Sequence, residues 1–127
     1  MADHPRPTDA ELAILRVLWD RGPSTVRQVH DVLSADRELG YTTVLKMLQI
    51  MDEKGLVARD MSERTHVFRA RQSRADTQRD LVGDLLDKAF GGSAMGLVMQ
   101  ALTARRASRE DLEEIRKLID QAEGERA

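Results

Sequence analysis

The middle of the chain limits the possible folds most, because a helical pattern changes there directly into strand patterns. Val44, Leu48 and Met51 recur at spacings of three and four residues, which predicts one buried face of a helix over residues 42–54. Gly55 predicts the end of that helix, since glycine adopts a left-handed backbone conformation without steric cost. The stretch that follows, about residues 56–70, alternates in polarity and is long enough only for a small β-structure.

Two short strands are predicted after this helix, at about residues 56–61 and 65–70. The second of them alternates between apolar and polar side chains, as a half-buried strand does. The linking residues 62–64 contain neither glycine nor asparagine, so the sequence gives only a weak turn signal. The two strands together are expected to form a β-ribbon.

Two further helices are predicted before residue 40. Thr8 and Glu11 have the spacing of a capping box, in which a hydroxyl and a carboxylate satisfy free N–H groups at a helix start. A glycine–proline pair ends this helix, and Ser24 or Thr25 is expected to cap the second, shorter one. Trp19 continues the apolar face of the first helix and is therefore expected in the core.

Beyond residue 72 the pattern is purely helical, with three predicted helices separated by glycines and polar turns. The order helix, helix, helix, ribbon is that of a winged helix-turn-helix. We therefore predict a mostly α protein with a small β-ribbon. A winged helix-turn-helix DNA-binding domain is expected in residues 1–72, and a helical dimerisation domain in residues 73–127.

The dimerisation prediction rests on the apolar faces of these last helices. About 55 residues in three helices can bury little apolar surface alone, so a second copy of the chain is the simplest cover. Packing of the same helices back onto the N-terminal domain is the alternative. The side chains predicted at the interface are Leu81, Leu85, Leu86, Phe90, Leu97, Val98, Leu102, Leu112, Ile115, Leu118 and Ile119.

Composition excludes several classes of function. The chain has no cysteine, so thiolate metal sites and a cysteine nucleophile are impossible. The sequence shows no metal-ligand spacing, phosphate loop or nucleophile elbow, and we expect neither an enzyme nor a bound metal or cofactor. It also lacks a signal-peptide pattern and a stretch of about 18–20 apolar residues, so we expect a cytoplasmic protein without membrane insertion.

The start of the third predicted helix carries the features of a duplex-DNA contact. Hydroxyls and a lysine in the first turns can reach base edges or phosphates in a major groove. An N-cap threonine and an ordinary surface lysine would give the same pattern, and that interpretation stays open. The residues predicted to bind DNA are Tyr41, Thr42, Thr43, Lys46, Gln49 and, in the ribbon, Arg64.

Charge leaves a second functional class open. The formal net charge is −2, and residues 1–72 hold equal numbers of basic and acidic residues, so any basic surface must be local. Five arginines nevertheless lie in or just after the predicted ribbon, which suits phosphate contacts. The alternative is a protein-interaction adaptor that uses a winged helix without binding DNA. The arginines are Arg59, Arg64, Arg69, Arg71 and Arg74.

Four stretches of the sequence, taken in order, resemble the penicillinase-repressor family of the BlaI/MecI type. The resemblance runs from about residue 8 to residue 119. The resemblance rests on the order and spacing of these motifs. The stretches are residues 8–19, residues 41–45 with 54–57, residues 66–69, and residues 90–93 with 97–98.

The resemblance implies a homodimeric repressor that binds a palindromic operator. It also implies a partner, a membrane metallopeptidase sensor encoded nearby, whose signal leads to cleavage of the repressor at about residues 91–98. Ile50 and Glu53 stand where better-known members carry basic residues, which lowers the attraction to phosphate. The chain contains no asparagine, so the Asn-Phe bond cut in well-known members is absent, and the lack of cysteine argues against copper sensing.

Overall fold

The computed structural model describes residues 6–126 and divides the chain into two compact units. The boundary between them falls between Val82 and Gly83, inside the fourth helix. The predicted domain limit at residue 72 lies just before that helix and stays a prediction. Thr77 is buried in the first unit, and this burial is one reason why the contacts of that unit extend past residue 72.

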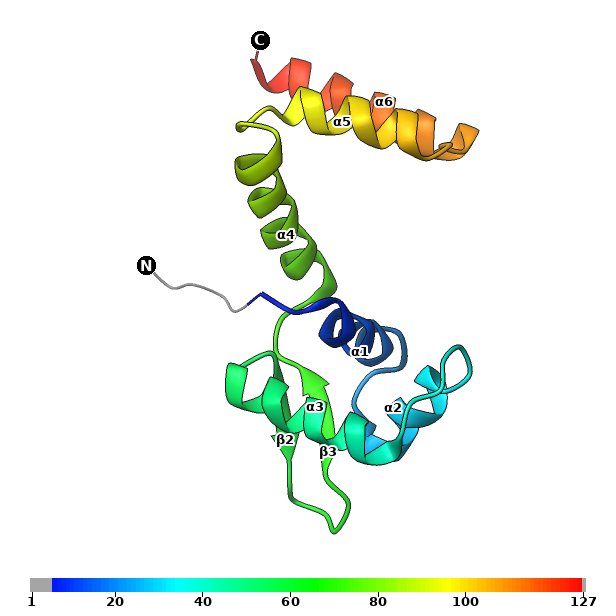
Figure 1. Ribbon diagram of the computed structural model, residues 1–127. Coiled ribbons are helices and arrows are strands. Elements are labelled where there is room, and N and C mark those ends of the chain that lie inside the picture. Colours follow the sequence, from blue (N-terminus) through cyan, green and yellow to red (C-terminus); the bar gives the residue numbers. More distant parts are fainter. Residues whose placement is uncertain (1–5, 127) are drawn as a thin grey trace. The chain divides into compact units, whose positions relative to one another are not determined.

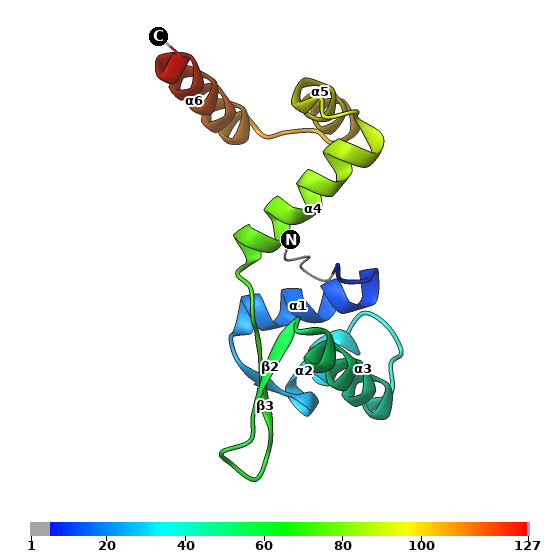
Figure 2. The same cartoon turned by 90° about the vertical axis from the view of Figure 1, so that its left-hand side faces the viewer.

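The first unit is a winged helix-turn-helix, as predicted. Its β2–β3 loop extends beyond the helices in both views of the ribbon (Figures 1 and 2). Each predicted helix and strand is present, with ends shifted by a few residues. The elements are α1 (Asp9–Arg21), β1 (Ser24–Thr25), α2 (Val26–Leu33), α3 (Tyr41–Lys54), β2 (Val57–Asp60) and β3 (Val67–Ala70).

The sheet has one strand more than the sequence predicts. β1 pairs antiparallel with β3, so the strand order is β1-β3-β2, and Phe68 faces Ser24 on one side and Arg59 on the other. The predicted two-stranded ribbon was therefore incomplete. A strand of two residues has no periodicity to detect, and the sequence identifies Ser24 and Thr25 only as possible helix caps.

The predicted caps position α1 and α2. The Thr8 hydroxyl accepts from the Glu11 N–H at 3.1 Å, and the Glu11 carboxylate accepts from the Thr8 N–H at 2.9 Å. Thr25 and Gln28 form the same reciprocal arrangement at the start of α2. Ser24, the other predicted cap, is buried and donates its hydroxyl to the Gly22 carbonyl oxygen at 2.8 Å.

The core lies between α1, α2, α3 and the sheet. The predicted inner face of α3 is confirmed, because Val44, Leu48 and Met51 are fully buried. Each buried aliphatic side chain of this size contributes about 1.5–3 kcal/mol relative to exposure. Gly55 ends α3 in the left-handed conformation, with φ of 83°, as predicted. The remaining core side chains are Ile14, Leu15, Val17, Leu18, Val26, Val29, Leu56, Val57 and Phe68.

Trp19 is partly buried and packs against the core, as its place on the apolar face of α1 predicts. Its ring lies under the Arg74 guanidinium, 5.6 Å from the ring centroid, and its indole N–H donates to the Gln72 carbonyl oxygen at 3.0 Å. Arg74 also pairs with Asp20 of α1. Trp19 therefore fastens the start of α4 (Arg74–Ala89) to α1 rather than filling the centre of the core.

A nearly buried ion pair connects the end of α3 to the start of α1. Lys54, in the last turn of α3, donates to the Glu11 carboxylate of α1 at 2.7 Å. Burial acts to raise the pKa of Glu11, but the hydrogen bonds from Lys54 and Thr8 and the Lys54 charge bring it below its ordinary value of 4.5. Glu11 therefore stays ionised and holds the end of α3 in place.

The second unit contains the rest of α4, then α5 (Ala94–Ala104) and α6 (Arg109–Arg126). Ser93 and Ser108 cap α5 and α6, since each hydroxyl accepts from the backbone N–H group three residues later at 3.0 Å. Gly91 and Gly92 have positive φ and end α4, as predicted. No described residue of α5 or α6 is buried, so this unit has no closed core of its own.

The Glu11–Lys54 pair makes a prediction about stability. The variant Lys54→Met should lower the free energy of unfolding by about 2 kcal/mol at pH 7, because it leaves a buried carboxylate unpaired. Because the pKa of Glu11 is lowered in the folded protein, the pair contributes fully to the free energy of unfolding above about pH 4.5. This contribution is lost as the pH falls further. Urea unfolding at fixed protein concentration, measured at pH 7 and in acid, checks this.

The matched control is Arg79→Met, which breaks the exposed pair with Asp76 on α4. That change should cost no more than about 0.5 kcal/mol at either pH, as surface pairs usually do. An equal decrease in the two variants, or a Lys54→Met effect that does not shrink in acid, would contradict the role assigned to the pair.

Candidate nucleic-acid interface

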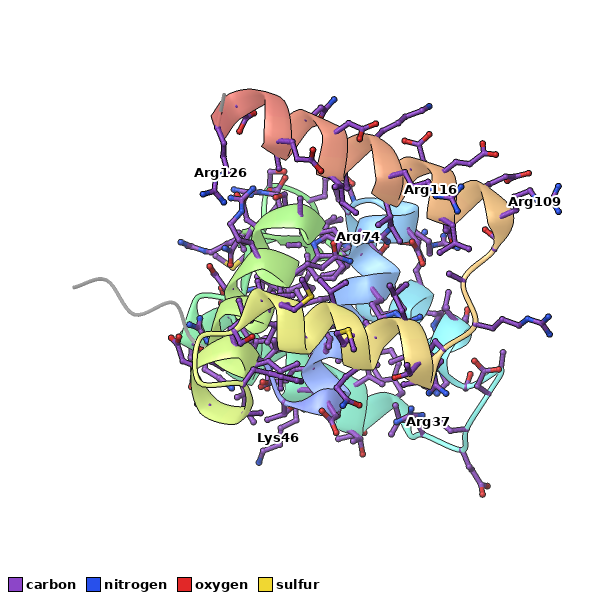
Figure 3. All side chains as sticks on the ribbon, turned by 90° about the horizontal axis from the view of Figure 1, so that it is seen from above. Arg37, Lys46, Arg74, Arg109, Arg116 and Arg126 are labelled. Atoms are coloured by element: carbon purple, nitrogen blue, oxygen red, sulfur yellow. The ribbon has the colours of Figure 1, made fainter. Side chains whose placement is uncertain are left out.

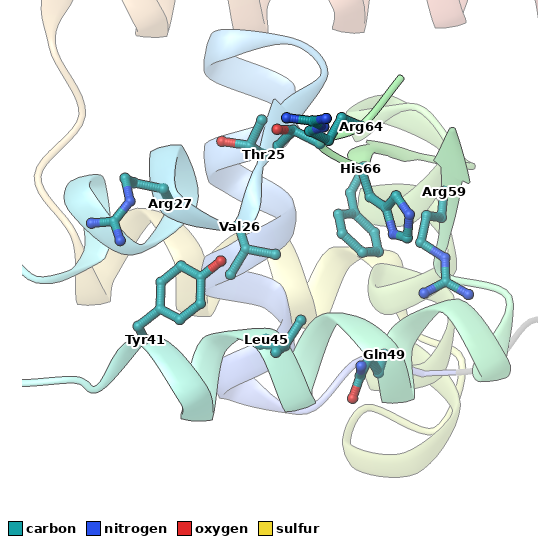
Figure 4. Close-up of a pocket in the computed structure, with 11 residues that line it drawn as sticks. Thr25, Val26, Arg27, Tyr41, Leu45, Gln49, Arg59, Arg64 and His66 are labelled. Atoms are coloured by element: carbon teal, nitrogen blue, oxygen red, sulfur yellow. The ribbon is translucent and has the colours of Figure 1, made fainter. Parts of the chain in front are cut away.

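A groove of about 650 Å³ runs between the start of α2, one side of α3 and the wing, which we define as β2, β3 and their loop. Figure 4 shows the groove with Arg27 and Tyr41 at one end and Arg59 and His66 at the other, while Arg64 is drawn between these ends near Thr25. Its further lining residues are Thr25, Val26, Leu45, Gln49, Thr65 and Phe68.

One stripe of α3 faces this groove. Tyr41, Leu45 and Gln49 follow one another at four-residue spacing, so they lie in line along the helix. Tyr41 is 40% exposed, and Gln49 is also exposed. The helix buries Val44, Leu48 and Met51 on another side, and this burial fixes the rotation that turns the stripe toward the wing.

A second stripe of α3, the outer stripe, consists of Thr42, Thr43 and Lys46 and faces solvent outside the groove. Thr42, Thr43 and Lys46 are exposed, and the Lys46 side chain extends away from the ribbon (Figure 3). Gly40 gives α3 no side-chain cap, so the first-turn N–H groups meet no capping side chain there. The six predicted DNA-contact residues therefore divide between the groove, with Tyr41, Gln49 and Arg64, and the outer stripe.

The wing loop closes without the expected turn residues. The Asp60 carboxylate accepts from the Ser62 N–H at 2.9 Å, and this hydrogen bond holds the pKa of Asp60 below its usual value. An Asp side chain that bonds the backbone two residues on replaces the missing glycine or asparagine. Arg64 follows in the exposed loop and lines the groove.

The five arginines predicted as a phosphate-contacting group are not equivalent. Arg59 lies 3.8 Å from the Asp52 carboxylate of α3, and Arg74 pairs with Asp20 and covers Trp19. These two charges are partly neutralised inside the first unit, although Arg59 also lines the groove. The other three, Arg64, Arg69 and Arg71, are exposed, and Arg64 alone of these three lines the groove.

Sequence reasoning missed two groove residues with charged or titratable side chains. Arg27 lies at the start of α2, and His66 follows the wing loop. Neither belongs to a spacing pattern, because the groove joins residues from three separate elements. Arg27 and His66 line the groove only because α2 and the wing pack around α3, and no local sequence signal reveals that packing.

Among residues 6–126, no three His, Asp or Glu side chains gather in a way that could hold a metal ion. No helix in that part of the chain is both long and apolar enough to cross a membrane.

The fold and the exposed stripes of α3 define a winged helix-turn-helix protein. Residues 7–121 match the family model described as penicillinase repressor. The chain belongs to the penicillinase repressor family, which is a family of transcriptional repressors. This confirms the resemblance seen in the sequence.

Two curated relatives match the chain. Both are called transcriptional regulator BlaI, and they come from two strains of Mycobacterium tuberculosis, CDC 1551 / Oshkosh and ATCC 25618 / H37Rv. Each is 41% identical over 90 residues, which is 70% of this chain and 65% of the relative. The match thus spans about two thirds of the relatives' own length.

Two solved structures resemble part of this chain. One is the solution structure of the DNA-binding domain of the repressor BlaI, with a TM-score of 0.52 and 25% identity. The other is the monomeric form of Bacillus licheniformis BlaI in complex with the blaP half-operator, with the same two values. Each match covers 60% of this chain and 93% of the solved chain.

Proposed function

We propose that this chain is a homodimeric transcriptional repressor that binds a palindromic DNA operator through α3 and the wing. The observation that carries the proposal is the rotation of α3. Its apolar side is fully buried, while the stripe with Thr42, Thr43 and Lys46 faces solvent beside the groove. The operator complex of the BlaI relative supports the same class of ligand.

The chemistry of the outer stripe suits a major groove. Lys46 can donate to guanine O6 and N7 or to a phosphate, and the two threonines can donate to phosphate or contact a thymine methyl group. Arg64, on the exposed wing loop, suits a contact with the DNA backbone, which positions the protein without reading sequence.

The second unit supports dimerisation. Leu118 is 64% exposed and Ile119 52% exposed on α6, and Val98 is 45% exposed on α5. Neither helix contains a buried residue, so these apolar side chains are not part of a closed core in the second unit. A second copy of the chain would cover them. A dimer would also carry two linked α3 helices, whose joint binding to DNA gains affinity through effective concentration. The eleven predicted interface residues are all partly or largely exposed.

We also propose that cleavage of the chain releases it from DNA. A membrane metallopeptidase sensor encoded nearby would act on residues 91–98, where Gly91, Gly92 and the start of α5 are exposed. Co-expression with a neighbouring peptidase should yield, on induction, a shortened repressor that no longer binds the operator. An intact chain on immunoblots after induction would contradict this route.

The DNA proposal is tested first with the wild-type chain, by selection from a pool of random-sequence duplexes. An enriched palindrome is expected, and gel-shift titration should show that its affinity falls steeply as salt rises. A winged-helix adaptor would enrich no sequence and shift no duplex, and that outcome would overturn the proposal.

On the selected duplex, Lys46→Ala should lower affinity about tenfold, as expected for a contact worth about 1–2 kcal/mol. Lys117→Ala removes the same charge from an exposed position of α6 and is the matched control. Sedimentation should show the same oligomer for both variants. Equal affinity of Lys46→Ala and wild type would remove Lys46 from the interface.

Dimerisation is tested with Leu85→Asp combined with Leu118→Asp, two exposed apolar positions of the second unit. Charges placed in an apolar interface are costly, so this variant should sediment as a monomer while keeping its helix content. Gln100→Asp combined with Gln121→Asp adds the same two charges at exposed polar positions and should stay dimeric. An intact dimer in the first variant would reject this interface.

A further inference from the structure

The groove contains a cation that the sequence did not mark as functional. Arg27, in the first turn of α2, is exposed and lines the groove. Its guanidinium carbon lies over the Tyr41 ring, 5.2 Å from the ring centroid. Figure 4 shows the two side chains together at the α2 end of the groove.

The charge of Arg27 is not neutralised within the first unit. Among residues 6–126 it forms no ion pair, whereas Arg59 and Arg74 lie beside carboxylates of α3 and α1. Its neighbour is an aromatic face, which attracts a cation without cancelling its charge. Arg27 therefore presents an uncompensated guanidinium to the groove.

The aromatic platform is itself held in place. The His30 ring meets the Tyr41 ring edge-on, with centroids 6.1 Å apart and an interplanar angle of 66°. His30 Nε2 lies 2.8 Å from the Leu39 carbonyl oxygen, which ties this ring to the turn before α3. A guanidinium stacked on a supported ring loses less freedom when it binds an anion than a free side chain does.

Two cations of the groove lie at its two ends. Arg27 is at the α2 end and Arg59 is at the opposite end, with Leu45 of α3 between them (Figure 4), and the wing also contributes Arg64 to the lining. A row of cation, helix face and cation matches a nucleic-acid backbone that follows the groove. A guanidinium can donate two parallel hydrogen bonds to one phosphate.

We propose that Arg27 is a second backbone contact, which binds one DNA phosphate at the α2 end of the groove. Tyr41 is a positioning residue for it, rather than only a direct DNA contact. The inference rests on the proposed DNA-binding function and adds a phosphate site that lies apart from the outer stripe of α3 and from the wing loop.

The test measures binding of the full chain to the selected duplex and to a scrambled duplex, by fluorescence anisotropy over a range of salt concentrations. Arg27→Ala should weaken binding to both duplexes by a similar factor, about three- to tenfold, because phosphates carry no sequence information. The slope of log affinity against log salt should become shallower by about 0.9 for each phosphate that the variant no longer neutralises. Arg27→Lys keeps the charge and should restore the slope.

Arg16→Ala is the matched control, because Arg16 is exposed on α1 and does not line the groove. It should leave affinity and salt slope as in wild type. The positioning role is tested by a double-mutant cycle. If Tyr41 acts partly through Arg27, Tyr41→Ala should lower affinity less in the Arg27→Ala background than in wild type.

The outcomes separate this inference from the function on which it rests. If the wild-type chain binds no duplex, the proposed function fails. If wild type binds but Arg27→Ala keeps the same affinity, or binds more weakly without a change in salt slope, the phosphate contact is overturned. If the effects of Tyr41→Ala and Arg27→Ala on affinity add in full, the positioning role of Tyr41 is overturned.

Discussion

The burial of one side of α3 organises the whole first unit. Val44, Leu48 and Met51 are fully buried and allow the helix a single rotation about its axis. That rotation places Tyr41 and Gln49 at the groove and leaves Lys46 in solvent. The exposed stripes of α3 follow from packing, because an amphipathic helix that buries its apolar side in the core presents its polar side to solvent or to a partner.

Two features keep this helix in position. The Glu11–Lys54 pair holds its last turn against the start of α1, and Gly55 turns the chain toward β2 directly after the helix. β1 then pairs with β3, so the wing is fastened to the segment that leads into α2. The groove is thus bounded by elements that are connected through hydrogen bonds as well as through the core.

Sequence reasoning predicted the elements well because their signals are local. The Thr8 capping box, the left-handed Gly55 and the apolar spacing of α3 each depend on residues within one or two turns. It failed where residues far apart in the chain meet. Arg27 reaches Tyr41, and Lys54 reaches Glu11, only after the helices pack, and no periodicity reveals either contact. β1 was missed because two residues cannot show a period.

Whether α3 and the wing bind DNA can be measured residue by residue in the NMR spectrum of the labelled chain, as duplex DNA selected by the wild-type protein is added. Amide shifts should concentrate in the first turns of α3, around Thr42 and Lys46, and in the wing loop around Arg64. Shifts confined to other surfaces, with the α3 amides unmoved at saturating duplex, would contradict the assignment of this interface.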